Sequence, residues 1–220
     1  MIKKLLVESI GTFFIIFLGF TAIINNIYNQ PFGLFFIALA FGVSSFIMIF
    51  LFYGISKANF NPAISFTFFI TGVLNLKEFL LYVLSQFIGG FIAMILLALL
   101  FSKNINLTIL TTNLQIINNS DLGQMLVIII IEFIASFILM FTYSFNKKKN
   151  FIIIGFTIFI LHLIFFNIDG MGLNPVRVII PSIFALNFSN VFYYIVGIFG
   201  GTISGGLFYH RLLKKNNKKK

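Results

Sequence analysis

Two stretches of this sequence decide its fold, Ala58-Asn59-Phe60-Asn61-Pro62-Ala63 and Gly172-Leu173-Asn174-Pro175-Val176-Arg177. In each, an asparagine stands directly before a proline. Asparagine is a favoured N-cap residue and proline is favoured at the first helical position, so each pair predicts the start of a helix. The apolar runs that begin there, residues 61–74 and 174–186, are shorter than the roughly 20 residues that cross a bilayer. The sequence therefore predicts two half-helices.

The rest of the chain is dominated by apolar segments. Hydrophobic residues make up 60% of the sequence and charged residues 9%, whereas soluble domains carry about 25% charged residues. Six apolar runs are long enough to span a membrane: residues 5–24, 32–55, 79–101, 122–145, 151–168 and 191–209. We therefore expect an all-α membrane protein with six transmembrane helices and two half-helices, folded as one domain over residues 1–220.

The distribution of basic residues predicts the orientation in the membrane. An even number of spans places both termini on one side, and thirteen of the fifteen lysine and arginine residues fall on that side. The other two, Lys103 and Arg177, fall on the opposite side. Because cytoplasmic loops are enriched in lysine and arginine, we expect both termini in the cytoplasm, with the chain in the plasma (inner) membrane.

The two halves of the chain read as copies of each other. The segment around Glu8 is echoed around Glu132, and Asn61-Pro62-Ala63 is echoed by Asn174-Pro175-Val176. Three spans per copy give inverted repeats, approximately residues 5–101 and 122–213, so the half-helices enter from opposite faces and their N-termini meet near the midplane. There the asparagine amides and the positive helix ends face a narrow aqueous pore that repels cations and hydronium.

The residue inventory argues against other classes of membrane protein. There is no cysteine, and there are only five acidic residues and two histidines, without a spacing that suggests catalysis or a metal site. We therefore expect no enzyme activity, no cofactor and no metal. A secondary transporter also uses inverted repeats, but it needs a titrating or ion-binding residue in its path. The sequence shows no motif for nucleic-acid binding.

These features resemble the major intrinsic protein family, the aquaporins and glycerol facilitators. The resemblance rests on the segment around Glu8, the two Asn-Pro motifs, residues 86–90 and Glu132, and it covers nearly the whole chain. It implies the family's fold, six tilted helices and two half-helices, in a homotetramer with one pore per subunit. The sequence departs from the family pattern at Val176, where alanine is usual, and at Asn59, where histidine is frequent.

The resemblance also implies an outer constriction, the selectivity filter. Its residues by position are Phe41, His162, Met171 and Arg177. Water-selective members of the family have histidine where His162 stands, whereas glycerol channels have a small residue there. Two ordinary interpretations remain open: His162 as a buried histidine satisfied by a neighbouring helix, and Arg177 as a side chain that extends to the outer surface.

Glu8 and Glu132 are interpreted as the only acids deep within the spans, at equivalent places in the repeat. Buried acids in membrane proteins can relay protons. The resemblance favours another role, in which each carboxylate braces the backbone of one pore loop. Glycines 197, 201 and 205, spaced four apart in the sixth span, favour close helix packing.

The expected function is a passive water channel of the water-selective type found in bacterial aquaporins. Water is the permeant, membrane lipid surrounds the protein, and glycerol and protons are excluded. The alternative within the same family is a facilitator of glycerol or other small neutral solutes.

Overall fold

A computed structural model describes residues 1–29, 33–101, 107–112, 121–145 and 151–214. Lys103, Lys147 to Lys149 and the basic tail after residue 214, which entered the orientation argument, lie outside the described residues. Six described helices are long and apolar enough to cross a membrane, as predicted: α1 (Ile2–Asn29), α2 (Gly33–Phe52), α4 (Leu76–Phe101), α5 (Asp121–Phe145), α6 (Phe151–Asp169) and α8 (Val191–Phe208). The short elements are α3 (Pro62–Ile70), η1 (Leu107–Leu110), α7 (Pro175–Ala185) and η2 (Tyr209–Lys214).

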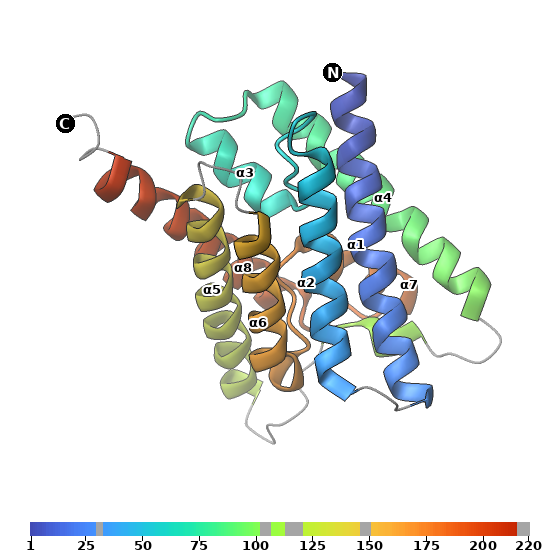
Figure 1. The fold of residues 1–220 in the computed structure, drawn as a ribbon. Coiled ribbons are helices and arrows are strands. Elements are labelled where there is room, and N and C mark those ends of the chain that lie inside the picture. The colour runs from blue at the N-terminus through green and yellow to red at the C-terminus, as the bar shows by residue number, and fades with distance from the viewer. Residues whose placement is uncertain (30–32, 102–106, 113–120, 146–150, 215–220) are drawn as a thin grey trace.

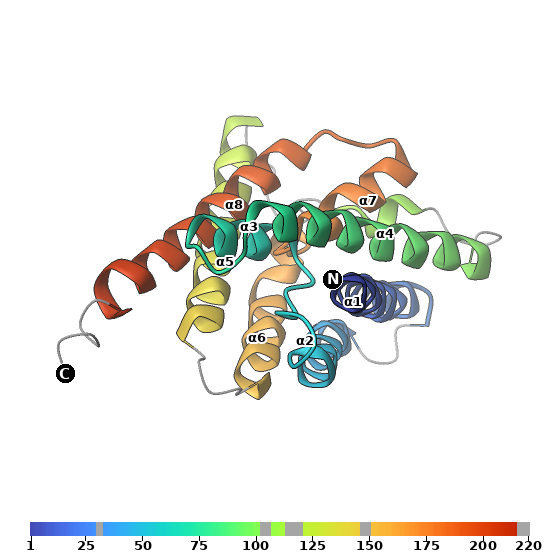
Figure 2. The ribbon, with the colours of Figure 1, turned by 90° about the horizontal axis from the view of Figure 1, so that it is seen from above.

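The six long helices pack in the same way in both halves of the chain. α1 packs against α2 and α4, and α5 packs against α6 and α8, while the α2–α6 contact joins the halves. In Figure 1, α1 runs downward and α5 runs upward, so the second half is inverted relative to the first. Seen from above in Figure 2, the long helices surround α3 and the loops that lead into the half-helices.

Glycines let the paired helices approach to backbone contact. A Cβ atom added to Gly89 on α4 would lie 2.1 Å from the carbonyl oxygen of Ser9 on α1. In the second half, a Cβ atom on Gly201 of α8 would lie 2.2 Å from the carbonyl oxygen of Phe133 on α5. No side chain fits in either place. The close packing expected from the glycine spacing in the sixth span is therefore present, and its counterpart lies in α4.

The first half-helix is shorter than the apolar run that contains it. The run covers residues 61–74, whereas α3 ends at Ile70. Gly72 adopts a left-handed backbone (φ 72°) and the amides of Val73 and Leu74 both return to the carbonyl of Phe68, which closes the helix. The second half-helix, α7, ends at Ala185, one residue before the end of its apolar run, because Leu186 is a left-handed C-cap (φ 51°).

Candidate functional site: a central pore

Both half-helices begin at the asparagines that the sequence singled out. Asn61 has an extended backbone, and its Oδ1 accepts hydrogen bonds from the amides of Ala63 (2.9 Å) and Ile64 (3.4 Å). Oδ1 of Asn174 accepts from the amide of Val176 (3.0 Å). Pro62 and Pro175 occupy the first helical positions. Each asparagine thus satisfies helix donors that have no partner within the helix.

The side-chain amides of the same asparagines tie the two halves together. Nδ2 of Asn61 donates to the carbonyl of Leu173 (2.8 Å), and Nδ2 of Asn174 donates to the carbonyl of Phe60 (2.9 Å). Each Nδ2 carries two hydrogens, so one hydrogen on each asparagine remains for another acceptor. Both asparagines line the central cavity, where a permeant can take that bond.

The loops that lead to the asparagines are strained in the same pattern. Ala58 and Phe60 in the first loop and Met171 and Leu173 in the second have left-handed backbones, with φ between 45° and 57°. This conformation costs roughly 1–3 kcal/mol for a residue other than glycine. It persists only where the surroundings hold the backbone, and in both loops a buried carboxylate does so.

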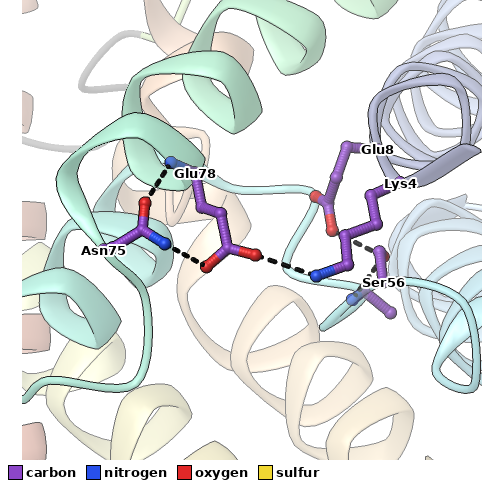
Figure 3. A network of polar contacts seen from close by, with 6 residues as sticks. Lys4, Glu8, Ser56, Asn75 and Glu78 are labelled. Carbon is purple, nitrogen blue, oxygen red and sulfur yellow. Dashed lines mark hydrogen bonds and ion pairs between the residues drawn. The ribbon is translucent and has the colours of Figure 1, made fainter. Parts of the chain in front are cut away.

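Glu8 on α1 holds the first loop. Its two carboxylate oxygens accept four hydrogen bonds, from the amides of Asn59 (3.1 Å) and Phe60 (2.8 Å), the hydroxyl of Ser56 (2.8 Å) and the amide of Gln86 (2.8 Å). The Ser56 hydroxyl oxygen in turn accepts from the amide of Ala58 (2.8 Å). Figure 3 shows Glu8 and Ser56 beside the ion pair of Lys4 with Glu78 (2.8 Å). Glu8 is completely buried, and its four hydrogen-bond partners are all donors within the protein.

Glu132 on α5 holds the second loop. It accepts hydrogen bonds from the amides of Gly172 and Leu173, the latter at 2.9 Å. A third acid, Asp169 at the end of α6, accepts from the amide of Met171 (2.9 Å) and is also fully buried. Asp169 is thus a third buried acid, although it is the last residue of α6 and does not lie deep within a span. Asp169 falls one residue beyond the predicted fifth span, which is why the sequence reasoning passed over it.

Phe41, His162 and Arg177 come together at one end of the central cavity. The rings of Phe41 and His162 stack with their centroids 4.3 Å apart and their planes 18° from parallel. The guanidinium of Arg177 lies over the ring of Phe41 (5.7 Å) and over that of Phe20 (4.8 Å). These distances are in the range of cation–π contacts. Phe20 was not singled out in the sequence, because one phenylalanine among 33 carries no signal.

Arg177 is buried, with 2% of its surface exposed, and does not extend to the outside. Nη1 donates to the carbonyl of Leu110 (3.0 Å) in η1, and Nη2 donates to the carbonyl of Gly170 (2.9 Å). Nε has no hydrogen-bond partner among the described residues. Two backbone carbonyls therefore fix the guanidinium, while Nε is left to bind something else.

His162 presents one nitrogen to the protein and leaves the other free. Nδ1 lies 2.9 Å from the carbonyl oxygen of Ile158. A carbonyl only accepts, so Nδ1 carries the hydrogen and Nε2 of the neutral ring is an acceptor. Nε2 is buried and has no partner within the described part of the chain. Nε of Arg177, another residue of the cavity wall, is a donor that also has no partner in that part of the chain, so the two side chains offer one acceptor and one donor.

Met171 and Val176 do not line the cavity in the described structure. Met171 is fully buried in the apolar core, although its backbone belongs to the strained second loop. Val176 is also fully buried, and its Cγ1 occupies the space where a Cβ of Gly90 on α4 would lie, 2.3 Å away. The larger residue in place of the family's alanine is thus accommodated by α4 and does not narrow the path.

The central cavity connects the stacked rings with the asparagines. It is lined from both halves by Ile15, Ile16, Phe41, Ser45, Asn59, Phe60, Asn61, Ile64, Leu139, Tyr143, Ile158, His162, Gly172, Leu173, Asn174 and Arg177. The space open to the centre of a water molecule is about 40 Å³. Among the described residues there is no group of three histidine, cysteine or acidic side chains that could hold a metal ion.

Comparison with known proteins decides the family. The family described as Major intrinsic protein matches residues 1–209 of the chain. The chain belongs to the major intrinsic protein family. This channel family is not a family of enzymes, in agreement with the expectation from the sequence. The chain is thus an aquaporin-family membrane protein with the fold predicted from its paired half-helices.

Several plant members of the major intrinsic protein family are similar along most of their length. A probable aquaporin NIP-type from Nicotiana alata is 32% identical and covers 99% of this chain and 80% of its own. Aquaporin NIP1-2 from Arabidopsis thaliana is 30% identical, with 95% and 74% covered. Among solved structures, the aquaglyceroporin from Plasmodium falciparum superposes with a TM-score of 0.82 at 20% identity, over 100% of this chain and 99% of its own.

Proposed function

We propose that this protein is a passive channel that passes water, selects it over glycerol and excludes protons. The observation that supports this is the stacked pair Phe41 and His162, closed on one side by Arg177. A water molecule needs roughly 10–15 Å³ of such space, so a cavity of about 40 Å³ holds about three in a row. A three-carbon polyol is bulkier than water, so we expect the constriction at these rings to exclude it by size.

The free polar atoms suit water as the permeant. Nε2 of His162 and Nε of Arg177 are buried without a partner among the described residues, and these two side chains line the cavity together with Asn61 and Asn174, each of which keeps one amide hydrogen for another acceptor. A buried polar atom without a partner is costly, and a water molecule supplies both a donor and an acceptor. Between these atoms the wall is apolar, with residues such as Ile64 and Leu139. Water therefore meets a few fixed polar atoms and can leave each of them easily.

Charge supports exclusion of protons and cations. The N-termini of α3 and α7 meet at the asparagines, and each carries a partial positive charge. Arg177 adds a full positive charge at the constriction. A cation or hydronium ion thus meets positive charge at two levels of the path.

The second candidate is a facilitator of glycerol or another small neutral solute. It is favoured by the comparisons, since the plant relatives named above are NIP-type aquaporins and the solved structure named above is called an aquaglyceroporin. The same fold serves either solute, so the choice depends on the width at Phe41 and His162. Of the two candidates, the 4.3 Å stack of these rings favours water.

We further propose the setting in which the channel works. The whole chain forms one channel domain of two inverted repeats, assembled as a homotetramer. Glu8 and Glu132 brace the pore loops and do not relay protons, because their oxygens are occupied by loop donors. The excess of basic residues on the side of the termini supports a plasma (inner) membrane location with both termini in the cytoplasm.

Stopped-flow light scattering on proteoliposomes tests the proposal. Under a sucrose gradient we expect rapid shrinkage with a low activation energy, and under a glycerol gradient we expect re-swelling at the rate of empty liposomes. Rapid re-swelling in glycerol would move the assignment to the facilitator. Shrinkage no faster than in empty liposomes, with protein present and correctly folded, would refute a water channel.

A further inference from the structure

The two pore loops are held by nearly the same set of bonds, and one position differs. In both loops the amides one and two residues before the asparagine donate to a glutamate, Glu8 or Glu132. The amide three residues before it donates to the side chain five residues before it. That side chain is Ser56 in the first loop (2.8 Å) and Asp169 in the second (2.9 Å). A carboxyl group thus occupies the place of a hydroxyl.

The hydroxyl of Ser56 also donates a hydrogen bond, which an ionised carboxylate cannot do. Ser56 accepts from the amide of Ala58 through its oxygen and donates its hydrogen to Oε1 of Glu8 (2.8 Å). An ionised aspartate only accepts, so it cannot donate to Glu132. Yet the two acids lie at neighbouring points of the same loop, because Oδ1 of Asp169 accepts from the amide of Met171 and Oε1 of Glu132 accepts from the next amide, that of Gly172. Oδ2 of Asp169 is buried, and no donor group of the described residues reaches it.

The charged surroundings do not neutralise two carboxylates. Among the described residues the ion pair within 4.0 Å is that of Lys4 with Glu78, so Arg177 on α7 is not in salt-bridge contact with either acid. Its guanidinium nitrogens donate to the carbonyls of Leu110 and Gly170 instead. Two ionised carboxylates close together in a buried site repel each other, and a proton held by one of them relieves the repulsion.

We propose that Asp169 carries a proton in the folded channel and donates it in a hydrogen bond to Glu132, so that it does for the second pore loop what Ser56 does for the first. Asp169 is then a positioning residue. It holds Met171 through Oδ1 and Glu132 through the protonated oxygen, and Glu132 holds the backbone of Gly172 and Leu173 next to Asn174.

The other titratable groups near Asp169 come from three elements. Glu132 faces it from α5 and Arg177 from α7, and Tyr194 on α8 donates its hydroxyl hydrogen to the backbone carbonyl of Asp169. α2, which also packs against α6, contains no titratable residue, and on α6 itself His162 lies about two turns earlier. Among these groups the carboxylate of Glu132 is the acceptor, so a protonated Asp169 donates its hydrogen bond to Glu132.

Isotope-edited infrared spectroscopy tests the proton without any transport. The sequence has only two aspartates, Asp121 and Asp169, so protein labelled with 13C at the aspartate carboxyl reports on very few groups. In a detergent without ester carbonyls at neutral pH, we expect a carboxylic-acid carbonyl band that shifts with the label and is absent from Asp169→Ser. A spectrum with no label-sensitive acid band, or one that Asp169→Ser retains, would overturn the proposal.

Water flux through variants of Asp169 then shows whether this position needs a neutral hydrogen-bond donor or a negative charge. This part assumes the channel function proposed above. Asn at position 169 can accept from Met171 and donate to Glu132, and Ser repeats the arrangement at Ser56, so both Asp169→Asn and Asp169→Ser should keep the flux of the unmodified channel. Asp169→Ala, which can do neither, should lose flux or folded protein. Loss of flux in both the Asn and the Ser variants would show that the negative charge is required.

A pH series provides the final comparison. Any loss of flux at alkaline pH should follow the loss of the infrared band in unmodified protein and should be absent from Asp169→Asn. An equal loss in both proteins would exclude Asp169 as its cause. If unmodified protein conducts no water at all, the function proposed above fails, and the infrared result still decides the proton.

Discussion

The four hydrogen bonds that Glu8 accepts in the first pore loop predict that Glu8→Gln lowers both stability and water flux. Glutamine has the shape of glutamate but replaces one acceptor oxygen with a donor NH2 group. At the position of Oε1, the NH2 group faces the amide of Asn59; at the position of Oε2, it faces the amide of Phe60. Ser56 and Gln86 can turn to accept from it, but a backbone N–H cannot. Either rotamer therefore leaves one buried backbone donor without an acceptor.

The size of the effect follows from these bonds. An orphaned buried donor costs about 1–3 kcal/mol, and bonds that lose their charged acceptor weaken by roughly 1 kcal/mol each. We therefore expect Glu8→Gln to lower the free energy of unfolding by about 3–5 kcal/mol, against typical total stabilities of about 5–15 kcal/mol. The left-handed backbones of Ala58 and Phe60 lose the group that holds them, so water flux should fall as well.

A matched control lies a short distance away in Figure 3. Glu78 is likewise a glutamate whose carboxylate accepts hydrogen bonds from other residues, here Lys4 (2.8 Å) and Asn75 (3.2 Å). It lies at the partly exposed N-terminal end of α4. Ion pairs of this kind contribute about 0–1 kcal/mol. Unfolding of both variants would be followed by circular dichroism during titration with dodecyl sulfate, alongside proteoliposome flux. If Glu8→Gln proved no less stable than Glu78→Gln, the hydrogen bonds to Glu8 would not hold the first pore loop as we infer.

Other predictions follow from the filter, the loops and the helix contacts. Replacing His162 with Gly and Phe41 with Trp removes the 4.3 Å stack, so glycerol permeability should rise in light scattering while water flux persists; unchanged glycerol exclusion would place the filter elsewhere. Asn174→Leu removes a cap, worth about 1 kcal/mol, and plugs the cavity with an apolar side chain, so flux should vanish from protein that still elutes as a folded species. Gly201→Ala places a methyl group 2.2 Å from a backbone oxygen and should lower the melting temperature through overpacking of about 1–3 kcal/mol, whereas the neighbouring Gly200→Ala, with its nearest contact at 3.2 Å to a ring, should have little effect; equal melting temperatures would contradict the close α5–α8 contact.

Local signals in the sequence predicted most of the architecture. Runs of 18 or more apolar residues and the Asn-Pro helix starts depend on neighbouring residues alone, and they were placed within a few residues. The apolar run from residue 61 continues to residue 74, beyond the end of α3, because the helix closes at Gly72, whose left-handed backbone is one of several conformations that glycine adopts with equal ease.

Residues of the pore site were predictable only where the internal repeat showed the same motif twice or where the family resemblance assigned the position a role. Asn61 and Asn174 were found because each stands in a copy of the same Asn-Pro motif. Phe20 and Leu110 also contact Arg177, but neither belongs to a sequence motif shared with it. Asp169 could have been found by aligning the two loops on their asparagines, because it then falls opposite Ser56. Whether Met171 faces the path or the core depends on its backbone angle, φ 45°, which residue type does not dictate.

The crossed bonds between the asparagines also constrain how the protein is made. Asn61 donates to a carbonyl 112 residues further along the chain, and Asn174 donates to one 114 residues back. During synthesis the first half emerges and enters the bilayer while both of its partners are still unmade. The first pore loop is already held by Glu8 from within the first half, but its two bonds to the second half can form only after residues 173 and 174 have been made and inserted. The first pore loop is therefore completed by the second half of the chain.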